Sequence, residues 1–331
     1  MSLRSISTTY SLSEGTLLPG YMPNAYLFGM DSSFAAPGLP FLLGSQDPEI
    51  RTQAVKNGWL TTSAALTMPF QQSSVENINV RADVEPFRDF RIQVDFKKTK
   101  TATYQEIYQL DTLNINPVTG NIEYAYDAQN PARIGNYNIT YFTLRTAFMQ
   151  DDAENNSEVF RQFEANREII LSRLERLNET DHSYNVNSQD VLIPAFLAAY
   201  SGQEANDISL SPFPRIPLPN WRLDYAGLPR LLPSLGEVFT SLNLSHAYTS
   251  TYGVSNYTNS LLYDNNDAGL LLSNNIEDYP LATRVDPTLP EEQQSLVPVY
   301  QIQQVVITER FSPLIGLNVR TRSRLTGRDR K

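Results

Sequence analysis

One stretch of the sequence decides the fold: residues 77–98, which have the sequence NINVRADVEPFRDFRIQVDFKK. Apolar and polar residues alternate along this stretch, with a break at Pro86. Because successive side chains of a β-strand point to opposite faces, the stretch predicts two strands joined by a tight turn. The residues of the apolar faces are Ile78, Val80, Ala82 and Val84, then Phe90, Ile92, Val94 and Phe96. Each strand therefore has one apolar and one hydrophilic face.

The same alternation predicts further strands on both sides of this hairpin. Seven strands are expected in all, near 2–11, 77–85, 90–102, 221–225, 238–252, 299–311 and 314–325. Three connections are short: around Pro86, across 227–236, and at Ser312-Pro313. The connections 13–74, 105–219 and 255–297 are long. Outer-membrane barrels combine short periplasmic turns with long outside loops, so we expect these long connections to form extracellular cap loops.

Two parts of the long connections have a pattern of their own. Residues 136–148 also alternate, but a membrane crossing there would place the later short turns outside. We therefore expect this segment in the external layer. Residues 158–177 have apolar side chains at helical spacing, and a second, shorter helix is expected between Ser188 or Asp190 and Gly202. These helices would cover the mouth of a barrel.

Composition favours a β-rich chain, excludes a helical membrane protein and leaves a membrane β-barrel open. Of the 331 residues, 41% are hydrophobic and only 19% are charged, and Tyr (18) and Phe (15) far outnumber Trp (2). No run approaches the ~20 apolar residues that a spanning helix needs, whereas barrel strands need only about ten residues of alternating polarity. The expected fold class is all-β with helical loop insertions: an antiparallel transmembrane β-barrel, present as an incomplete part of a very large barrel.

The charge and the rare residue types exclude several functions. A net charge of −10 argues against nucleic acid as a partner. The chain has no Cys and only two His, His182 and His246, so no cofactor, metal site or catalytic site is predicted. The acidic loop 264–267 fails the EF-hand pattern because Ala268 occupies a ligand position. The first residues contain no apolar core of a signal peptide, which predicts either a cytosolic protein or an internal part of an exported chain.

Several segments, spread in order over nearly the whole chain, resemble the SprA/Sov family of gliding-motility proteins. These proteins are the outer-membrane translocons of the type IX secretion system in Bacteroidetes. The matching segments are 14–20 (EGTLLPG), 44–48 (GSQDP), 57–62 (NGWLTT), 188–202 (SQDVLIPAFLAAYSG), 219–225 (PNWRLDY), 244–252 (LSHAYTSTY) and 311–316 (FSPLIG). The resemblance covers only a C-terminal portion of the family's chain, which is several times longer.

The resemblance implies a function in protein secretion. It implies a single-chain barrel of very many strands in the bacterial outer membrane, whose lumen passes folded cargo proteins to the cell surface. A PorV-like partner barrel would cover a side opening, a plug protein would close the periplasmic end, and outer-membrane lipid would surround the wall. The family has no catalytic residues to carry over, so an enzyme is not expected.

Three sets of residues are candidates for these contacts. The lumen-facing candidates are Arg91, Asp95, Arg320, Arg322 and Arg324; an anion-binding ladder is the alternative interpretation of the three C-terminal arginines. The candidate cap or partner-contact loop contains Asp190, Pro194, Phe196 and Tyr200. The candidate membrane-interface aromatics are Trp221, Tyr225 and Tyr248.

Two other functions remain open from the sequence. One is another outer-membrane barrel, such as a TonB-dependent nutrient transporter. The other is a soluble β-sandwich adhesin or glycan binder that uses exposed Tyr side chains and Trp59. The apolar strand faces distinguish the classes, because a sandwich packs them on a second sheet and a barrel exposes them to lipid.

Overall fold

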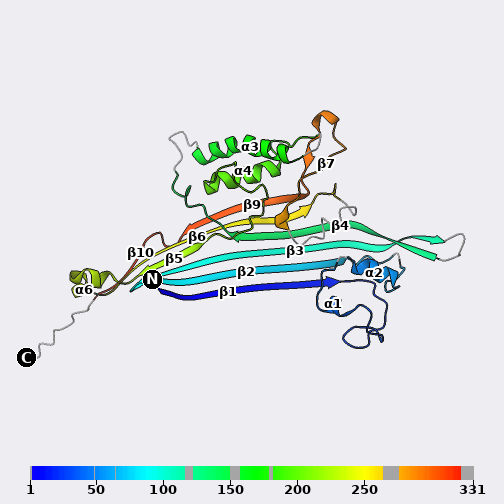
Figure 1. Ribbon diagram of the computed structural model, residues 1–331, viewed down its shortest axis with the longest axis horizontal. Helices are drawn as coiled ribbons and strands as arrows, with labels where there is room; N and C mark the ends of the chain where they lie inside the picture. The colour runs from blue at the N-terminus through cyan, green and yellow to red at the C-terminus, as the bar shows by residue number, and fades with distance from the viewer. Residues whose placement is uncertain are drawn as a thin grey trace, which may run out of the picture.

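The computed structural model describes residues 2–47, 49–63, 65–115, 122–149, 157–178, 182–263 and 276–321. These residues form a mostly antiparallel β-structure dominated by one eight-stranded sheet (Figure 1). The strands of this sheet are β1 (Ser2–Leu17), β2 (Phe70–Phe87), β3 (Phe90–Ile115), β4 (Ile122–Thr140), β5 (Asn220–Tyr225), β6 (Phe239–Asn259), β9 (Tyr300–Phe311) and β10 (Gly316–Thr321).

Shorter elements lie in the connections. The helices are α1 (Leu39–Leu42), α2 (Ile50–Lys56), α3 (Glu158–Leu177), α4 (Gln189–Ser201), α5 (Leu228–Leu231) and α6 (Pro233–Val238). Two 3₁₀ turns, η2 (Ile276–Asp278) and η3 (Glu291–Gln293), and the small pair β7 (Arg284–Val285) and β8 (Leu296–Val297) follow β6. No helix of the described residues is long and apolar enough to cross a membrane.

The eight strands occupy six lanes, where a lane is one position across the sheet. β4 pairs with β3 from Lys98 to Ile115, and β5 pairs with the beginning of the same β3 edge, from Phe90 to Asp95. β4 and β5 therefore lie end to end in one lane and run in the same direction. β9 and β10 share a lane in the same way, because both run antiparallel along one edge of β6. The lane order is β1, β2, β3, β4/β5, β6 and β9/β10.

This topology corrects two predictions. Residues 136–140 were expected in an external layer, but they belong to the main sheet as the end of β4. Ser312-Pro313 was expected to form a hairpin turn, but the chain continues past it in the same direction from β9 into β10. The 79 residues between Thr140 and Asn220 leave the β4/β5 lane and return to it, so the prediction of seven separate crossings becomes six lanes.

Strand lengths also differ from prediction. β1 continues to Leu17, β2 begins at Phe70, β3 reaches Ile115 and β6 reaches Asn259. The expected cap loops 13–74, 105–219 and 255–297 therefore begin or end with strand, and the second of them contains all of β4. The hairpin between β2 and β3 is confirmed, as are the predicted helices at 158–177 and between Ser188 and Gly202.

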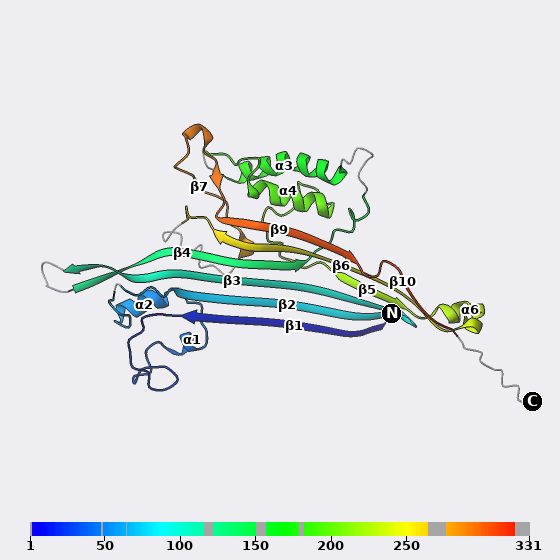
Figure 2. The same ribbon diagram turned by 180° about the vertical axis from the view of Figure 1, so that it is seen from behind.

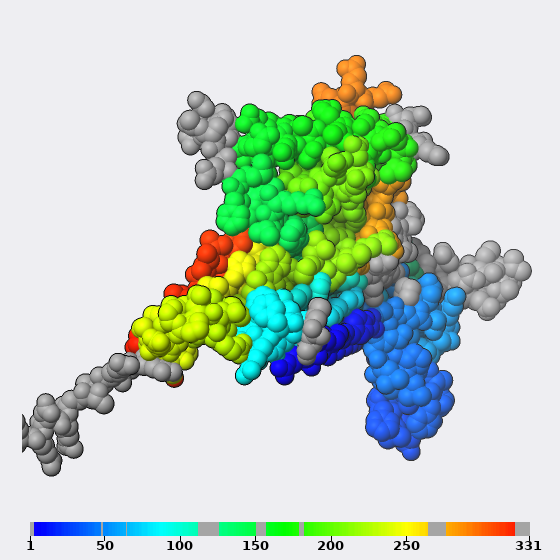
Figure 3. Space-filling view, turned by 60° about the vertical axis from the view of Figure 1, so that its left-hand side comes forward, coloured from blue at the N-terminus to red at the C-terminus, as the bar shows by residue number. Residues whose placement is uncertain are grey.

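The two ends of the sheet differ. The beginning of β1, the β2–β3 turn, α5 and α6, and the end of β10 lie at one end, which we call the short-turn end (Figures 1 and 2). The long connections containing α1 and α2 begin at the opposite, long-loop end. In both views α3 and α4 lie beside β9 and β6, and α1 and α2 lie beside the far ends of β1 and β2. Figure 3 shows both groups as masses that project from the sheet.

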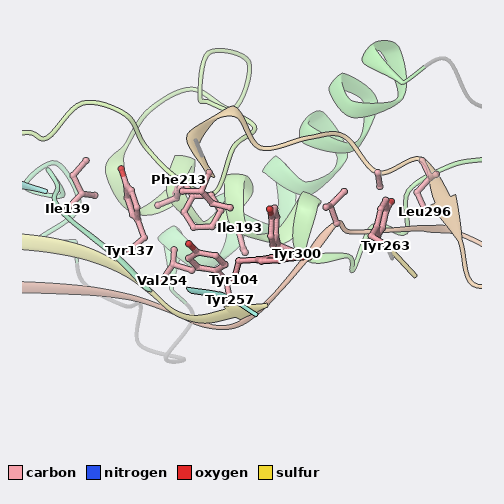
Figure 4. Packing of buried hydrophobic residues seen from close by; sticks show 14 of the residues in the cluster. Tyr104, Tyr137, Ile139, Ile193, Phe213, Val254, Tyr257, Tyr263, Leu296 and Tyr300 are labelled. Carbon is pink, nitrogen blue, oxygen red and sulfur yellow. The ribbon is translucent and has the colours of Figure 1, made fainter. Parts of the chain in front are cut away.

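An aromatic core attaches α3 and α4 to the sheet, and we call these two helices together with the segments that pack around them the cap. Phe213, from the segment after α4, makes edge contacts with Tyr137 of β4 and Tyr257 of β6 at 5.4 Å and 5.3 Å between ring centroids (Figure 4). Ile193 of α4 and Tyr300 of β9 join the same cluster. These side chains are buried, so the cap is fixed to the sheet by a true hydrophobic core.

Candidate functional site: a two-faced wall

The functional feature of the sheet is the difference between its two faces. Cross-strand partners share a face, so the register assigns each side chain to one side. One row of partners runs Ile6, Ala82, Val94, Trp221, Tyr248 and Phe311 across all six lanes. This face is apolar from the short-turn end up to about the middle of the sheet. We call that region the apolar belt.

The apolar belt repeats along every lane. On β3 it includes Phe90, Ile92, Val94 and Phe96, as the sequence predicted, and their partners on β2 are Phe87, Val84, Ala82 and Val80. At the two edges the side chains remain largely exposed, with exposed fractions of 61% for Ile6, 61% for Leu317 and 77% for Ile315. The helices of the cap lie beside the part of the sheet nearer the long-loop end, but the segment after β4 reaches the belt, where Phe142 contacts Trp221 and Phe148 contacts Phe311. The belt therefore spans the width of the sheet; it is open at the two edges of the sheet, and the segment after β4 covers it at Tyr248.

Aromatic clusters mark two levels of the belt. At the short-turn end Phe87 stacks on Phe90 at 4.9 Å, and Tyr225 meets both rings edge-on. Nearer the middle, Trp221 stacks on Tyr248 at 4.5 Å. Trp221 and Tyr225, predicted as membrane-interface aromatics, thus both lie on the belt.

Tyr248 is a correction to that prediction. Its side chain is on the apolar face, but it is completely buried. Its hydroxyl accepts a hydrogen bond from the Thr143 backbone N–H at 3.0 Å and donates to Glu309 at 2.8 Å. Tyr248 therefore anchors the segment after β4 to the sheet and is not an interfacial residue.

The opposite face is hydrophilic, and the predicted lumen-facing residues of the described chain share it. Arg91 and Asp95 lie on this face of β3, and Arg320 lies on it in β10, paired with Ser241. Asp95 accepts a hydrogen bond from Gln93 at 2.7 Å, and Gln93 is bonded in turn by Arg81. Arg322 and Arg324 lie outside the described residues. Arg91, Asp95 and Arg320 therefore share one face of the sheet, and their position in a lumen stays a prediction.

An ion-pair cluster ends the apolar belt on the side of the long loops. Lys98 and Lys100 continue the apolar face of β3, and both pair with Glu277 of η2; Lys100 also pairs with Glu76 of β2 at 2.8 Å. Burial alone would raise the pKa of Glu277, but the hydrogen bond from Lys98 and the charge of Lys100 outweigh it and hold the pKa below its ordinary value. The cluster ties the segment after β6 to the sheet.

A second buried ion pair fixes the loop between β1 and β2. Arg51 of α2 pairs with Glu106 of β3, and Tyr104 donates a hydrogen bond to the same carboxylate. The Glu106 side chain has no exposed area. Glu106 lies on the face of Lys98, and the sequence analysis missed both groups. The available signal was the charge itself, because a charged residue on the apolar side of an alternating strand predicts a covering partner.

The candidate cap-contact residues divide into two pairs. Asp190 and Pro194 are buried within the cap, so neither side chain is available to a partner. Burial raises the pKa of Asp190 to about 6, although a hydrogen bond from Tyr279 at 2.7 Å opposes that shift. Phe196 and Tyr200 instead contact each other at 4.6 Å and line a cavity of about 550 Å³ beside β9.

The potential metal ligands and the histidines are a further feature of the chain. No group of three or more His, Asp or Glu side chains among them is arranged to hold a metal ion. His246 lies on the apolar face, opposite Leu223, and its Nδ1 is 2.6 Å from the Leu314 carbonyl oxygen. No protein-family model matches the chain, and a search of curated proteins gave no match.

Proposed function

We propose that this chain is a wall and cap segment of an outer-membrane pore that passes folded proteins to the cell surface. The pore would be a type IX secretion translocon of the SprA/Sov kind. The observation that carries the proposal is the apolar belt, which is exposed at both edges of the sheet on one face of strands whose other face is mainly hydrophilic. A soluble sandwich would cover the belt with a second sheet, whereas a membrane barrel presents such a belt to lipid and its hydrophilic face to a water-filled lumen.

The height of the belt supports this proposal. From Phe90 to Phe96 the belt covers six residue intervals along β3, or about 20 Å at roughly 3.3 Å per residue. Beyond Phe96 the same face carries Lys98 and the cap. An outward apolar band about 25 Å tall, bordered by aromatic residues, is typical of outer-membrane barrels. The belt would thus lie in the hydrocarbon, with the cap above it at the cell surface.

The edges of the sheet support a larger barrel. Among the described residues β1 pairs only with β2, and the β9/β10 lane pairs only with β6. Unpaired strand edges are strongly unfavourable in lipid, so both lanes need neighbours. β1 runs away from the short-turn end and β10 runs toward it, so an antiparallel barrel closes around these six lanes with an even number of additional strands. A PorV-like barrel and a plug protein would bind to the completed pore.

The two tryptophans of the chain provide a direct test of the lipid contact. Trp221 lies on the belt, and Trp59 lies in the external connection between β1 and β2. Trp59→Phe leaves Trp221 as the only tryptophan, and Trp221→Phe is the matched control that leaves Trp59. In vesicles of brominated phospholipid we expect fluorescence quenching in the first variant and little in the second. Equal quenching of the two variants, or none in either, would refute the proposed orientation.

A second experiment tests which end of the sheet is outside. The chain contains no Cys, so single cysteines can be introduced without removing native ones. Leu261, 94% exposed at the long-loop end, and Arg88, exposed in the β2–β3 turn, are the two positions. A maleimide that does not cross membranes should label Leu261→Cys on intact cells and label Arg88→Cys only after the outer membrane is opened. The reverse labelling pattern would invert the topology.

A further inference from the structure

The hydrophilic face is divided into a charged part and an uncharged part. Near the short-turn end its rows contain Arg81, Asp83, Arg91, Asp95 and Asp224. The last charged row contains Lys97, which pairs with Asn79. Charges of both signs therefore gather at one end of this face.

Beyond Lys97 the described side chains of this face are uncharged over a long distance. The next row runs Ser11, Asn77, Thr99, Asn138, Gly253 and Val306 across all six lanes. Rows through Thr101, Thr103 and Gln105 of β3 follow, and the next charge on the face is Asp127, opposite Gln109. We call these rows the uncharged band. From Thr99 to Ile107 the band measures about 26 Å along the strand, at roughly 3.3 Å per residue.

The absence of charge in this band is not explained by burial. Thr99, Asn136 and Asn138 are exposed, as is Gln304 of β9. The chain as a whole has 62 formally charged side chains, 26 basic and 36 acidic. On the opposite face at the same level lie Lys98, Lys100 and Glu106, so these strands carry charges under the cap while their open side has none.

We propose that the uncharged band is a contact surface for passing proteins that does not discriminate by their charge. This inference rests on the proposed function, because it assigns the hydrophilic face to the lumen. A single pair of opposite charges in contact in water prolongs an encounter about fivefold, and several such pairs multiply the effect. Hydroxyl and amide side chains, with the apolar Val75, Ile134 and Val306 interspersed among them, keep the wall hydrated without holding a charged protein surface, so acidic and basic folded proteins pass equally. Charge is sensed only in the rows near the short-turn end.

The test introduces charge into the band and reverses its sign. Thr99→Glu combined with Gln304→Glu places two acidic groups on exposed positions of β3 and β9. Thr99→Lys combined with Gln304→Lys places two basic groups there. Thr99→Gln is the neutral control: residue 304 is Gln in the native chain, so this one substitution places uncharged Gln at both positions. Asn243→Glu is a second control that adds the same charge near the short-turn end, where charges are already present.

The measurement is the composition of the culture supernatant of cells whose only copy of the chain is the variant. Secreted proteins are separated by isoelectric point. We expect the Glu pair to reduce the export of basic proteins about fivefold relative to acidic ones, and the Lys pair to reverse that ratio. The neutral control should leave it unchanged, and Asn243→Glu should change it less. Unchanged ratios in both charged pairs, or an equal loss of all secreted proteins, would overturn the inference.

A blocking experiment separates this failure from failure of the proposed pore. Thr103→Cys lies within the band and would be the only cysteine of the chain. Reaction with a maleimide carrying a long polyethylene glycol should stop export of all proteins if the hydrophilic face lines the lumen. Blocked export with no charge dependence would overturn the uncharged band and retain the pore. Continued export after complete labelling would overturn the pore itself.

Discussion

Replacing Val94 by Arg tests whether the apolar belt contacts lipid. Val94 lies on β3 between Ala82 and Trp221. It is four residue intervals, or about 13 Å, from the level of Lys98, where polar surroundings begin. That distance exceeds the reach of an arginine side chain, so the guanidinium cannot escape the apolar zone along the strand. A cation near the centre of a lipid-facing strand costs about 2–4 kcal/mol. We therefore expect Val94→Arg to reduce the folding equilibrium constant about 30- to several-hundred-fold.

Gln93→Arg is the matched control, because Gln93 is the adjacent residue on the same strand and faces the hydrophilic side. The variant loses the hydrogen bond from Arg81 but keeps Asp95 as a partner for the new guanidinium, so its cost should stay below about 1.5 kcal/mol. The assay is denaturant titration of the chain folded into lipid vesicles, followed by the amount of each variant in the outer membrane of cells. A loss of stability of equal size in both variants, or a larger loss for Gln93→Arg, would refute the assignment of the two faces.

Three further predictions concern the cap and its attachment. Glu277→Gln should release the segment after β6 at a cost of about 2 kcal/mol, which should be detected as faster hydrogen exchange at 276–299. The pKa of Glu277 is lower in the folded protein than its ordinary value of 4.5. The stability that the Glu277 carboxylate contributes should therefore be lost as the pH falls below 4.5. Asp190→Asn should raise the melting temperature above about pH 6, because the carboxylate is ionised there at the expense of stability, and this advantage should vanish as the pH falls toward 3.8. Gly135→Ala should destabilise the sheet by about 1–3 kcal/mol in a denaturant titration, since its Cβ would overlap the Tyr257 ring; Gly253→Ala, whose Cβ would have its nearest neighbour at 3.5 Å, should be nearly neutral.

The extent of the strands was only partly predictable. The alternation of apolar and polar residues located the part of each strand nearer the short-turn end, because the apolar belt lies there. Between the belt and the long-loop end, one face of the sheet is hydrophilic and the other is covered by the cap. The simple alternation of apolar and polar residues ends there. β3 was predicted to end near residue 102 but continues to Ile115; its residues 103–106 are Thr, Tyr, Gln and Glu, which do not alternate between apolar and polar. Pattern recognition therefore underestimates strands whose environment changes along their length.

The order of the lanes was not predictable from local sequence. Residues 136–140 alternate like a wall strand, and they are one, but the chain leaves the sheet at Thr140 and resumes the same lane at Asn220. The apparent turn at Ser312-Pro313 is an interruption within a lane. Both errors share a cause. Pairing between strands that are distant in sequence depends on long-range hydrogen bonds. A short interruption between two strands has the same local sequence pattern whether the chain turns back there or continues in the same lane.

The sequence by itself determined that the strands are two-faced, which residues belong to each face, where the β2–β3 turn lies and where the two long helices begin and end. Periods of two and of 3.6 residues are local properties, and short-range backbone geometry is enough to express them. Only the tertiary structure decided that the six lanes align their apolar faces into one belt and that Glu277 covers Lys98 at its border. It also decided that the described rows from Thr99 to Ile107 carry no charge on the face opposite the cap. These features depend on the register between the strands, because strand pairing brings together side chains from distant parts of the chain.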